Sequence, residues 1–332
     1  MKKIYTILIC GMLAIPLMAV TYRVNNQLTV NPSAKIYITL QAAHNAAANG
    51  DTILVEGSPL IYGDAFTCTK RLFIKGPGYF LDENPGISAN KLPARFTNQF
   101  NLDDGSSGTV ITGIVHQMSY ISVNTDNITF RRCQLELMAT ENGVSNLTIS
   151  GCYFETSSIY PNIGSNLVTN LIVTNCIIKG DVNFLSGCTG TFINNIFTST
   201  YINIPTGFVM KNNIIFTTEK PGINLPALDA AVSYNMSISD HFGTANNNKA
   251  NVSATALFVG DATESTDGKW QLKAGSPALA AGEGGVDCGA YGGPKPYILS
   301  GLPAGPVIYE LNVSSYVRPD GKLPVTIKVK AW

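Results

Sequence analysis

The stretch Ile128-Thr-Phe-Arg-Arg-Cys133-Gln-Leu-Glu136 is repeated, with changes, along the middle of the chain. Close copies are Leu147-Thr-Ile-Ser-Gly-Cys152-Tyr-Phe-Glu155 and Leu171-Ile-Val-Thr-Asn-Cys176-Ile-Ile-Lys179. Weaker copies centre on Asn195, Asn213 and Asn235, so that the six centres are 19, 24, 19, 18 and 22 residues apart. Repetition at this period is typical of solenoids, in which each repeat forms one turn and contacts its neighbours.

Apolar residues within each copy lie at positions −5, −3 and +2 relative to the central Cys or Asn. This alternation predicts a short strand, a tight corner and a second short strand. A repeat built from a helix pair needs about 30 residues or more and an apolar period of 3.6 residues, and neither is present. We therefore predict an all-β fold in which each copy is one turn of a parallel β-helix.

The composition excludes some classes of partner. The chain has 332 residues, a formal net charge of zero and only 13% charged residues. A nucleic-acid-binding or polybasic membrane-binding protein normally carries a basic face, so we expect neither kind of partner. The 31 glycines suit many short strands joined by tight corners.

Residues 1–19 have the pattern of a secretory signal peptide. Lys2 and Lys3 precede an apolar run from Ile4 to Leu17, and Ala19 precedes a polar segment. The run is shorter than the roughly 20 residues that span a bilayer. We therefore expect a secreted, periplasmic or cell-surface protein with no transmembrane segment after cleavage.

The two ends of the predicted solenoid differ from its repeats. Residues 38–49 are rich in alanine and end at Gly50, which predicts an N-terminal capping helix. Residues 307–313 and 323–329 alternate as strands around a turn sequence, which predicts a C-terminal β-hairpin that covers the last rung or, alternatively, belongs to an interaction module. The predicted units are a signal peptide (1–19), a capped β-helix (20–293) and a C-terminal β annex (294–332).

Several of these segments resemble a known group of proteins. The segment from Leu40 to Val55, followed by Tyr62, resembles the entry segment of right-handed parallel β-helix proteins of the pectin-lyase-like superfamily. Residues 76–85, 275–278, 287–293 and 296–301 are similar to exported β-helix repeat proteins of Bacteroidetes-type bacteria. The resemblance implies a right-handed parallel β-helix and says little about activity, because that superfamily includes lyases, hydrolases, esterases and adhesins.

The outward position +3 holds charged residues on successive copies, namely Glu136, Glu155 and Lys179. His116 joins them if Gly113 occupies the Cys position of its own turn. Equivalent residues of neighbouring turns lie about 4.8 Å apart. We expect the two carboxylates to raise one pKa by repulsion, and Lys179 to keep Glu155 ionised.

This column suggests one catalytic hypothesis. A carboxylic acid beside a carboxylate is the pair used in glycoside hydrolysis, and a cation can stabilise the charge that develops in β-elimination. Arg131 and Arg132 can bind a uronate carboxylate, and an exposed Tyr153 or Tyr120 can stack on a sugar ring. The alternative is that the column is an ordinary solvated ladder, because outward positions of a β-helix are polar anyway.

Metal and cofactor sites have little support in the sequence. Six cysteines follow the leader without CxxC spacing, and we expect most to be free, buried thiols. Calcium would need several acidic residues on one face, and only Asp181, Glu155 and Glu136 come near each other. Calcium therefore stays an open alternative without support, and we expect no other cofactor.

The function expected from the sequence is that of an exported β-helix that binds glycan or forms a cell-surface or adhesive element. Its expected partner is a polysaccharide or cell-surface glycan, and we expect a monomer. The alternative is a polysaccharide lyase or glycoside hydrolase acting on an acidic polysaccharide.

Overall fold

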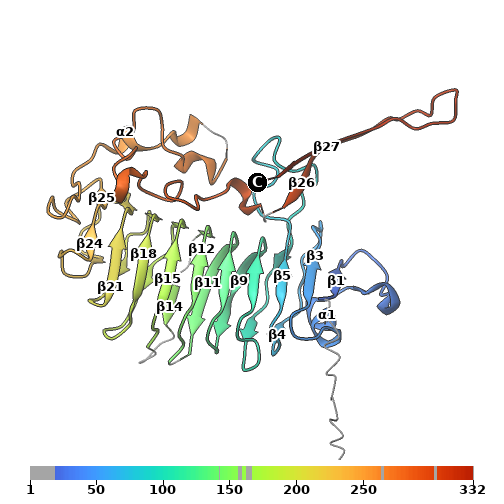
Figure 1. Cartoon of the computed structure of the whole chain (residues 1–332), viewed down its shortest axis with the longest axis horizontal. Helices are drawn as coiled ribbons and strands as arrows, with labels where there is room; N and C mark the ends of the chain where they lie inside the picture. Colours follow the sequence, from blue (N-terminus) through green and yellow to red (C-terminus); the bar gives the residue numbers. More distant parts are fainter. Residues whose placement is uncertain are drawn as a thin grey trace, which may run out of the picture.

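The computed structural model describes residues 19–141, 143–155, 159–161, 167–262, 265–302 and 305–331. The predicted signal peptide therefore lies outside the described residues, apart from Ala19. The described chain is a parallel β-solenoid of about 9 turns, and this confirms the fold class predicted from the repeats (Figure 1).

Two parallel sheets form the walls of the solenoid. The first has 11 strands, and from β8 onward each of them is followed by the left-handed corner residue of its turn. In spatial order they are β2 (Ile36–Tyr37), β1 (Thr21–Val24), β3 (Thr52–Val55), β5 (Phe73–Lys75), β8 (Val110–Thr112), β10 (Thr129–Arg131), β12 (Thr148–Ser150), β15 (Leu171–Thr174), β18 (Gly190–Ile193), β21 (Phe208–Lys211) and β24 (Val232–Ser233).

The second sheet has 14 strands and lies after the corners. Its main path is β23 (Ile223–Asn224), β20 (Ile202–Asn203), β17 (Val182–Asn183), β14 (Ile159–Pro161), β11 (Gln134–Thr140), β13 (Tyr153–Phe154), β16 (Ile177–Ile178), β19 (Ile196–Phe197), β22 (Ile214–Ile215) and β25 (Met236–Ser237). The earlier turns add β4 (Phe66–Cys68), β6 (Arg95–Phe96), β7 (Phe100–Leu102) and β9 (Val115–Val123).

The register of the strands confirms the alignment of the repeats. Phe130 pairs with Ile149, which pairs with Val173, and all three are fully buried at position −3. On the second sheet Leu135 pairs with Phe154, another buried pair. Each inward column therefore stacks one apolar side chain per turn, and the sum of these columns is the main hydrophobic core.

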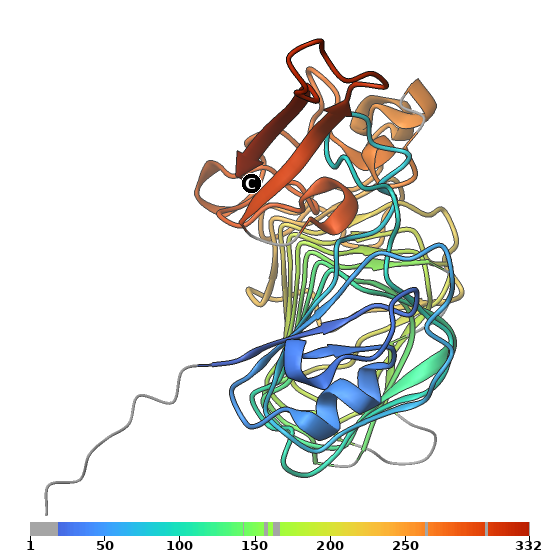
Figure 2. The same ribbon diagram turned by 90° about the vertical axis from the view of Figure 1, so that its right-hand side faces the viewer.

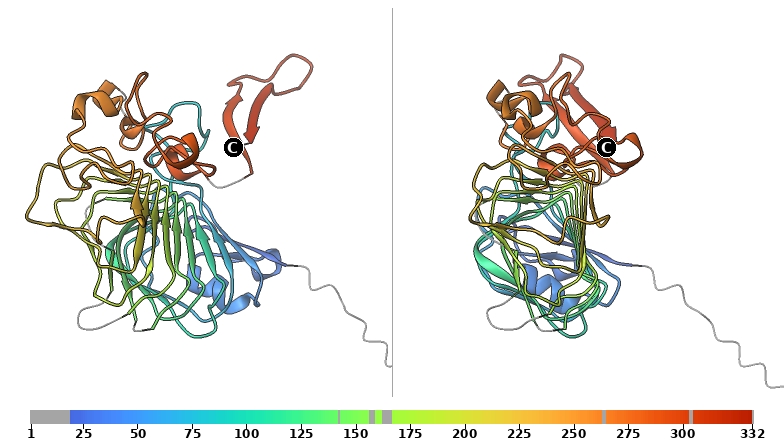
Figure 3. Two further views of the ribbon diagram at one scale, coloured as in Figure 1. Left: turned by 60° about the vertical axis from the view of Figure 1, so that its left-hand side comes forward. Right: turned by 90° about the vertical axis from the view of Figure 1, so that its left-hand side faces the viewer.

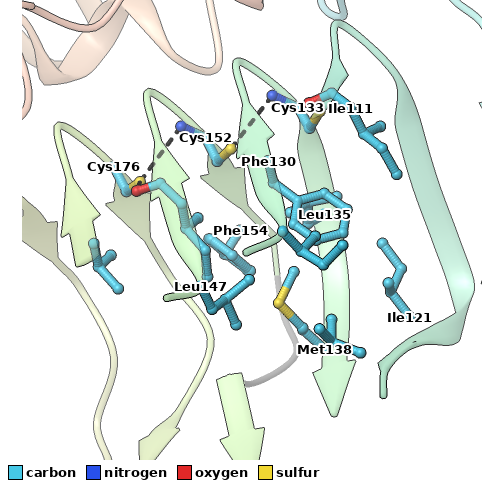
Figure 4. Close-up of a cluster of buried hydrophobic side chains, with 14 of the residues drawn as sticks. Ile111, Ile121, Phe130, Cys133, Leu135, Met138, Leu147, Cys152, Phe154 and Cys176 are labelled. Carbon is cyan, nitrogen blue, oxygen red and sulfur yellow. Dashed lines mark hydrogen bonds between the residues drawn. The ribbon is translucent and has the colours of Figure 1, made fainter. Parts of the chain in front are cut away.

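The central Cys positions form one continuous column in the interior (Figure 4), and the central Asn positions continue it. Sγ of Cys152 accepts the backbone N–H of Cys133 at 3.5 Å, and Sγ of Cys176 accepts that of Cys152 at 3.4 Å. Asn195 takes over the same role, because its Oδ1 accepts the N–H of Cys176 at 2.9 Å. The six described cysteines are all buried and free of disulfides.

The residue before each central position turns the corner with a left-handed backbone. Its φ is +53° at Arg132, +61° at Gly151 and +54° at Asn175, values that Gly and Asn adopt most readily. Gly113 occupies this corner position with φ +68°, because Thr112 pairs with Arg131. Placing Gly113 in the Cys position was therefore wrong by one residue.

The N-terminal helix is shorter than predicted. Helix α1 (Leu40–Ala46) has seven residues, and its Leu40 and Ala43 side chains are buried in the main core. Thr39 begins it by accepting the N–H of Ala42 at 3.1 Å. Lys70 Nζ ends it by donating to the carbonyl oxygens of His44 and Ala47 at 2.8 and 2.7 Å.

The solenoid closes well before the end of the chain. Its last parallel pairing joins Met236 to Lys249, and the fully buried Phe242 completes the core there. Residues 250–302, here called the covering segment, then run back along the outside of the turns (Figures 1 and 2). The predicted β-helix span, 20–293, thus includes residues 250–293 of this segment, which lies over the turns and adds none.

The covering segment is mostly irregular. Its short elements are α2 (Ala254–Leu257), η2 (Gly260–Ala262), η3 (Gly268–Trp270), η4 (Glu283–Gly285) and η5 (Leu299–Gly301), and η1 (Pro32–Ala34) lies near the N-terminus. A second hydrophobic cluster joins it to position +1 of the turns, where Tyr153, Ile177 and Ile196 are buried under Leu257, Cys288 and Tyr297. Position +1 thus faces outward and is nevertheless apolar.

The chain ends in the antiparallel hairpin predicted from its alternation. Strands β26 (Pro306–Val313) and β27 (Val325–Ala331) pair only with each other among the described residues. The hairpin extends away from the solenoid (Figures 1 and 3), and the backbone N–H of Ala89 holds its base by donating to Ile308 at 2.8 Å. The expectation that it covers the last rung is therefore wrong.

Candidate functional site

A groove lies where the covering segment crosses the corner end of the first sheet. Its volume is about 700 Å³. One wall is the outward column formed by Arg131, Ser150, Thr174 and Ile193, which the strand register places on four successive turns. The opposite wall is the segment Pro294-Lys295-Pro296 with Ile298.

Three cationic side chains line this groove, and no carboxylate is among the described residues that line it. They are Arg131 and Arg132 on the solenoid side and Lys295 on the covering segment. Arg131 and Lys295 are exposed, and neither side chain has an ion-pair partner among the described residues. The groove therefore presents positive charge that the described chain does not neutralise.

Arg132 is more constrained than its neighbour. Its Nη1 donates to the carbonyl oxygen of Leu302 at 2.7 Å, which fixes the guanidinium against the covering segment. Burial, followed by the positive charge of Arg131, lowers the pKa of Arg132. The positive charge of Arg131 raises the free energy of the charged form of Arg132. An anion bound in the groove would offset this repulsion between the two guanidinium groups.

The rest of the lining suits a ligand with both hydroxyls and apolar faces. Thr148, Ser150 and Thr174 supply hydroxyl groups, while Ile172 and Ile193 supply apolar surface between them. Successive turns repeat these groups about every 4.8 Å along the solenoid axis. The groove therefore offers repeated contacts to an extended polymer.

Corner asparagines hold the covering segment beside the groove. Asn175 Nδ2 donates to the carbonyl oxygens of Ala290 and Gly292 at 2.9 and 2.7 Å, and Asn194 Nδ2 donates to Asp287 at 2.9 Å. These side chains occupy the left-handed corner position, so one residue both turns the chain and binds the segment that covers it.

A buried carboxylate fixes the other end of the groove wall. Asp267 Oδ2 accepts the backbone N–H of Ser300 at 2.7 Å and the hydroxyl of Tyr297 at 3.2 Å. Its Oδ1 accepts the side-chain amide of Asn84 at 3.0 Å. The hydroxyls of Tyr297 and Tyr79 are 2.6 Å apart, so this network ties the covering segment to the segment that follows β5. Its donors satisfy the buried charge, as a structural role requires.

The residues of the predicted acidic column do not line this groove. Lys179 Nζ and Glu155 Oε1 form an ion pair of 2.7 Å, and each side chain is 30% exposed. Glu136 Oε2 accepts the backbone N–H of Met118 at 2.5 Å. None of Glu136, Glu155 and Lys179 lines the groove that contains Arg131 and Arg132. The structure thus separates the predicted catalytic column from the predicted substrate clamp.

Two other predicted site residues are buried. His116 pairs with Leu135, so it occupies the inward +2 column and is fully buried. Its ring contacts Phe100, and its Nε2 lies 2.9 Å from the carbonyl oxygen of Asn98. Tyr153 is also fully buried, because the covering segment packs on position +1. Both predicted substrate-binding side chains are therefore covered by the chain itself and are not exposed at the surface.

A second cavity of about 480 Å³ lies beneath α2. The rings of Phe216, Phe258 and Trp270 form one side of it and pack edge to face, with centroids 5.3–5.6 Å apart. Lys269 Nζ lies 5.6 Å from the Trp270 ring centre. The three rings are in contact with one another. We therefore interpret this cluster as a hydrophobic contact that holds the covering segment, through Phe258 and Trp270, against Phe216 of the solenoid.

Sequence reasoning identified Arg131 and Arg132 but missed Lys295, Asn175 and Asn194. A signal for the asparagines was present, because Asn recurs immediately before the central position in several copies. Lys295 had no such signal, since it lies in a segment without periodicity.

Comparisons with known proteins assign no family to the chain. No family model matches it, and no curated protein matches it. Among the described residues, no helix has the length and apolar character needed to cross a bilayer, and no group of three or more His, Cys, Asp or Glu residues is placed to hold a metal ion.

Proposed function

We propose that this protein binds an acidic polysaccharide in the groove formed by the first sheet and Pro294-Lys295-Pro296. The observation that carries the proposal is the set of three cations, Arg131, Arg132 and Lys295, in a groove whose described lining has no carboxylate. Arginine binds a uronate-type carboxylate through two parallel hydrogen bonds, and lysine adds a point charge from the opposite wall.

The shape of the site supports a polymer as the ligand. A solenoid repeats its outward side chains at constant spacing, so an extended chain can make the same kind of contact on several turns. Hydroxyl groups of Thr148, Ser150 and Thr174 can exchange hydrogen bonds with sugar hydroxyls. Binding without catalysis is favoured, because the acidic column does not line this groove.

Export and family membership form part of the same proposal. A glycan-binding protein of this kind acts outside the cytoplasm, which agrees with the signal-peptide pattern of residues 1–19. We place the chain among right-handed β-helices of the pectin-lyase-like superfamily, with α1 as the cap of its first turn. The parallel solenoid supports this assignment at the level of architecture.

The test compares acidic and neutral polysaccharides of matched length, such as polygalacturonate and a neutral glucan, by calorimetry and affinity electrophoresis. The double variant Arg131→Ala/Lys295→Ala should weaken binding to the acidic polymer at least about tenfold, the effect of losing about 1.4 kcal/mol. Affinity of the wild type should fall as salt rises.

The matched control is Arg95→Ala/Lys220→Ala, which removes two exposed cations that do not line the groove. It should bind like the wild type. Equal binding of acidic and neutral polymers, or equal affinity of both double variants, would contradict the proposal. Release of products from the same polymers, abolished by Glu155→Gln, would favour a lyase or hydrolase instead.

A further inference from the structure

The C-terminal hairpin is strongly two-faced. Ile308 pairs with Val329, Leu311 with Ile327 and Val313 with Val325, and a bulge after Ile308 keeps the three pairs on one side of the ribbon. Paired residues of an antiparallel ribbon point to the same face. The six apolar side chains are 42–55% exposed, namely Ile308, Leu311, Val313, Val325, Ile327 and Val329.

The opposite face of the ribbon is polar. Lys328 Nζ and Glu310 Oε2 form an ion pair of 2.6 Å, and Asn312 pairs with Thr326 beside it. Polar groups thus occupy the face that can remain in water, while the apolar face has no cover from the described chain. A soluble ribbon gains nothing from six exposed aliphatic side chains, so this face indicates a contact with another surface.

The contacts described for the hairpin with the rest of the chain lie at its base. Val307 packs against the small cluster of Leu81, Ile87 and Leu302, and Ala89 bonds to the backbone of Ile308. Beyond this point the ribbon projects from the body of the molecule (Figure 3). An isolated two-stranded sheet is only marginally stable in water, so a partner on its apolar face would also stabilise the ribbon.

The free edges of the ribbon are less suitable for contact between copies than its face. Lys328 and Lys330 alternate along β27, and lysines on an edge strand oppose pairing with an identical edge. The apolar face contains no charge, so two such faces can meet without repulsion. Insertion into a bilayer is disfavoured, because the unpaired edge N–H and C=O groups would lose their hydrogen bonds to water.

We propose that two copies of this chain associate through this face, with the ribbons packed face to face about a twofold axis. The area agrees with a weak dimer. Half-exposed aliphatic side chains lose roughly 60 Å² each, so twelve lose about 700 Å². The tip residues Tyr316, Val317 and Leu323 are 46–68% exposed and are the apolar surface that can enlarge this contact to about 1,100 Å², close to the lower limit for a specific interface.

Sedimentation velocity on the full chain tests this dimer. A concentration series across the micromolar range should show a reversible dimer, in place of the monomer expected from the sequence. The double variant Leu311→Asp/Ile327→Asp should weaken the association at least about tenfold. The control Asn312→Asp/Thr326→Asp places the same charges on the opposite face of the same strands and should preserve the dimer.

A cross-linking experiment does not depend on the stability of the aspartate variants. Ile327→Cys places a thiol on the apolar face and Thr326→Cys places one on the polar face, while the six described native thiols are buried. A short bis-maleimide should join two Ile327→Cys chains at least about tenfold faster than two Thr326→Cys chains. The reason is that the dimer holds the two thiols at position 327 close together across the interface and leaves those at position 326 on the outer faces.

The inference is overturned if the wild type remains monomeric over the whole series, or if both cysteine variants cross-link at the same rate. Binding of the monomeric chain to lipid vesicles or glycan, abolished by Leu311→Asp/Ile327→Asp, would also overturn it and identify another occupant of the face. None of these outcomes depends on whether the Arg131 groove binds polysaccharide.

Discussion

Asn195 and Asn213 are joined by a doubled hydrogen bond across neighbouring turns. Oδ1 of Asn213 accepts the backbone N–H of Asn195 at 2.9 Å and its side-chain Nδ2 at 3.0 Å. Asn213 repeats the arrangement with Asn235 at 3.0 and 2.9 Å, and Asn235 repeats it with Asn248 at 2.8 and 3.2 Å. The interior column is therefore an amide ladder that satisfies polar groups in an apolar core.

Removing one rung of this ladder should be costly. Asn213→Ala deletes a side chain that also donates to the carbonyl oxygen of Phe192 at 2.7 Å, and it leaves several buried partners unsatisfied. We expect a loss of about 4 kcal/mol in the free energy of unfolding, measured with urea. The control Asn203→Ala removes an outward, partly exposed amide and should cost less than about 1 kcal/mol. Equal losses would contradict a special role for the interior column.

The cysteine end of the same column should accept asparagine. Sγ of Cys176 already accepts the N–H of Cys152 and lies 3.7 Å from the carbonyl oxygen of Ile149, the contacts that an asparagine makes elsewhere in the column. Cys176→Asn should therefore change the free energy of unfolding by no more than about 1 kcal/mol, whereas Cys176→Leu should cost about 2 kcal/mol or more through overpacking. Thermal unfolding distinguishes the two. A larger loss for asparagine than for leucine would show that thiol and amide are not interchangeable here.

The sequence was sufficient to predict this ladder because its physical cause is local and periodic. Apolar residues at −5, −3 and +2 must face one interior, and parallel stacking then places every Cys or Asn above the next. The error at Gly113 has an equally local cause. Gly113 occupies the left-handed corner position, like Arg132 and Asn175. Aligning Gly113 with Cys133 shifted it by one residue, from the corner to the position after the corner.

The covering segment was not predictable in the same way. It has no repeat, and its position depends on contacts with residues more than 70 positions away, such as that of Glu283 with Asn212. One clue was available, because position +1 is apolar in Tyr153, Ile177 and Ile196 although alternation makes it outward. An apolar outward column predicts a cover. It does not say which part of the chain supplies that cover, so Lys295 could not be placed beside Arg131.

The corner asparagines should control how firmly the covering segment is held. Asn194→Gly keeps a residue that tolerates the left-handed backbone and removes the amide that donates to Asp287 and Gly289 and accepts from Asn212. Backbone amides of residues 287–293 should exchange with deuterium about 5- to 30-fold faster, which corresponds to a loss of about 1–2 kcal/mol. Protection of the inner strands should not change.

Asn146→Gly is the matched control for this exchange experiment. Asn146 has the same left-handed backbone, but its amide donates to Asn127 on the exposed side of the solenoid. It should leave exchange in the covering segment as in the wild type. Faster exchange of residues 287–293 in both variants would attribute the effect to the backbone and not to the amide.

His116 should make the stability of the solenoid depend on pH. Burial lowers its pKa to about 4 from the ordinary value of 6.5, so the folded chain resists protonation that the unfolded chain accepts. The contribution of neutral His116 to the free energy of unfolding is fully present above about pH 6.5. It is lost as the pH falls from 6.5 towards 4, and it does not decrease further below that value.

The variant His116→Leu tests this dependence. It places at this position the residue type found at Leu135, its partner in the next turn, and removes the titrating group. Between about pH 7 and pH 4.5 the wild type should lose about 2–3 kcal/mol more than the variant in urea unfolding. The same loss in both proteins would show that His116 is protonated in the folded chain, contrary to its position in the core.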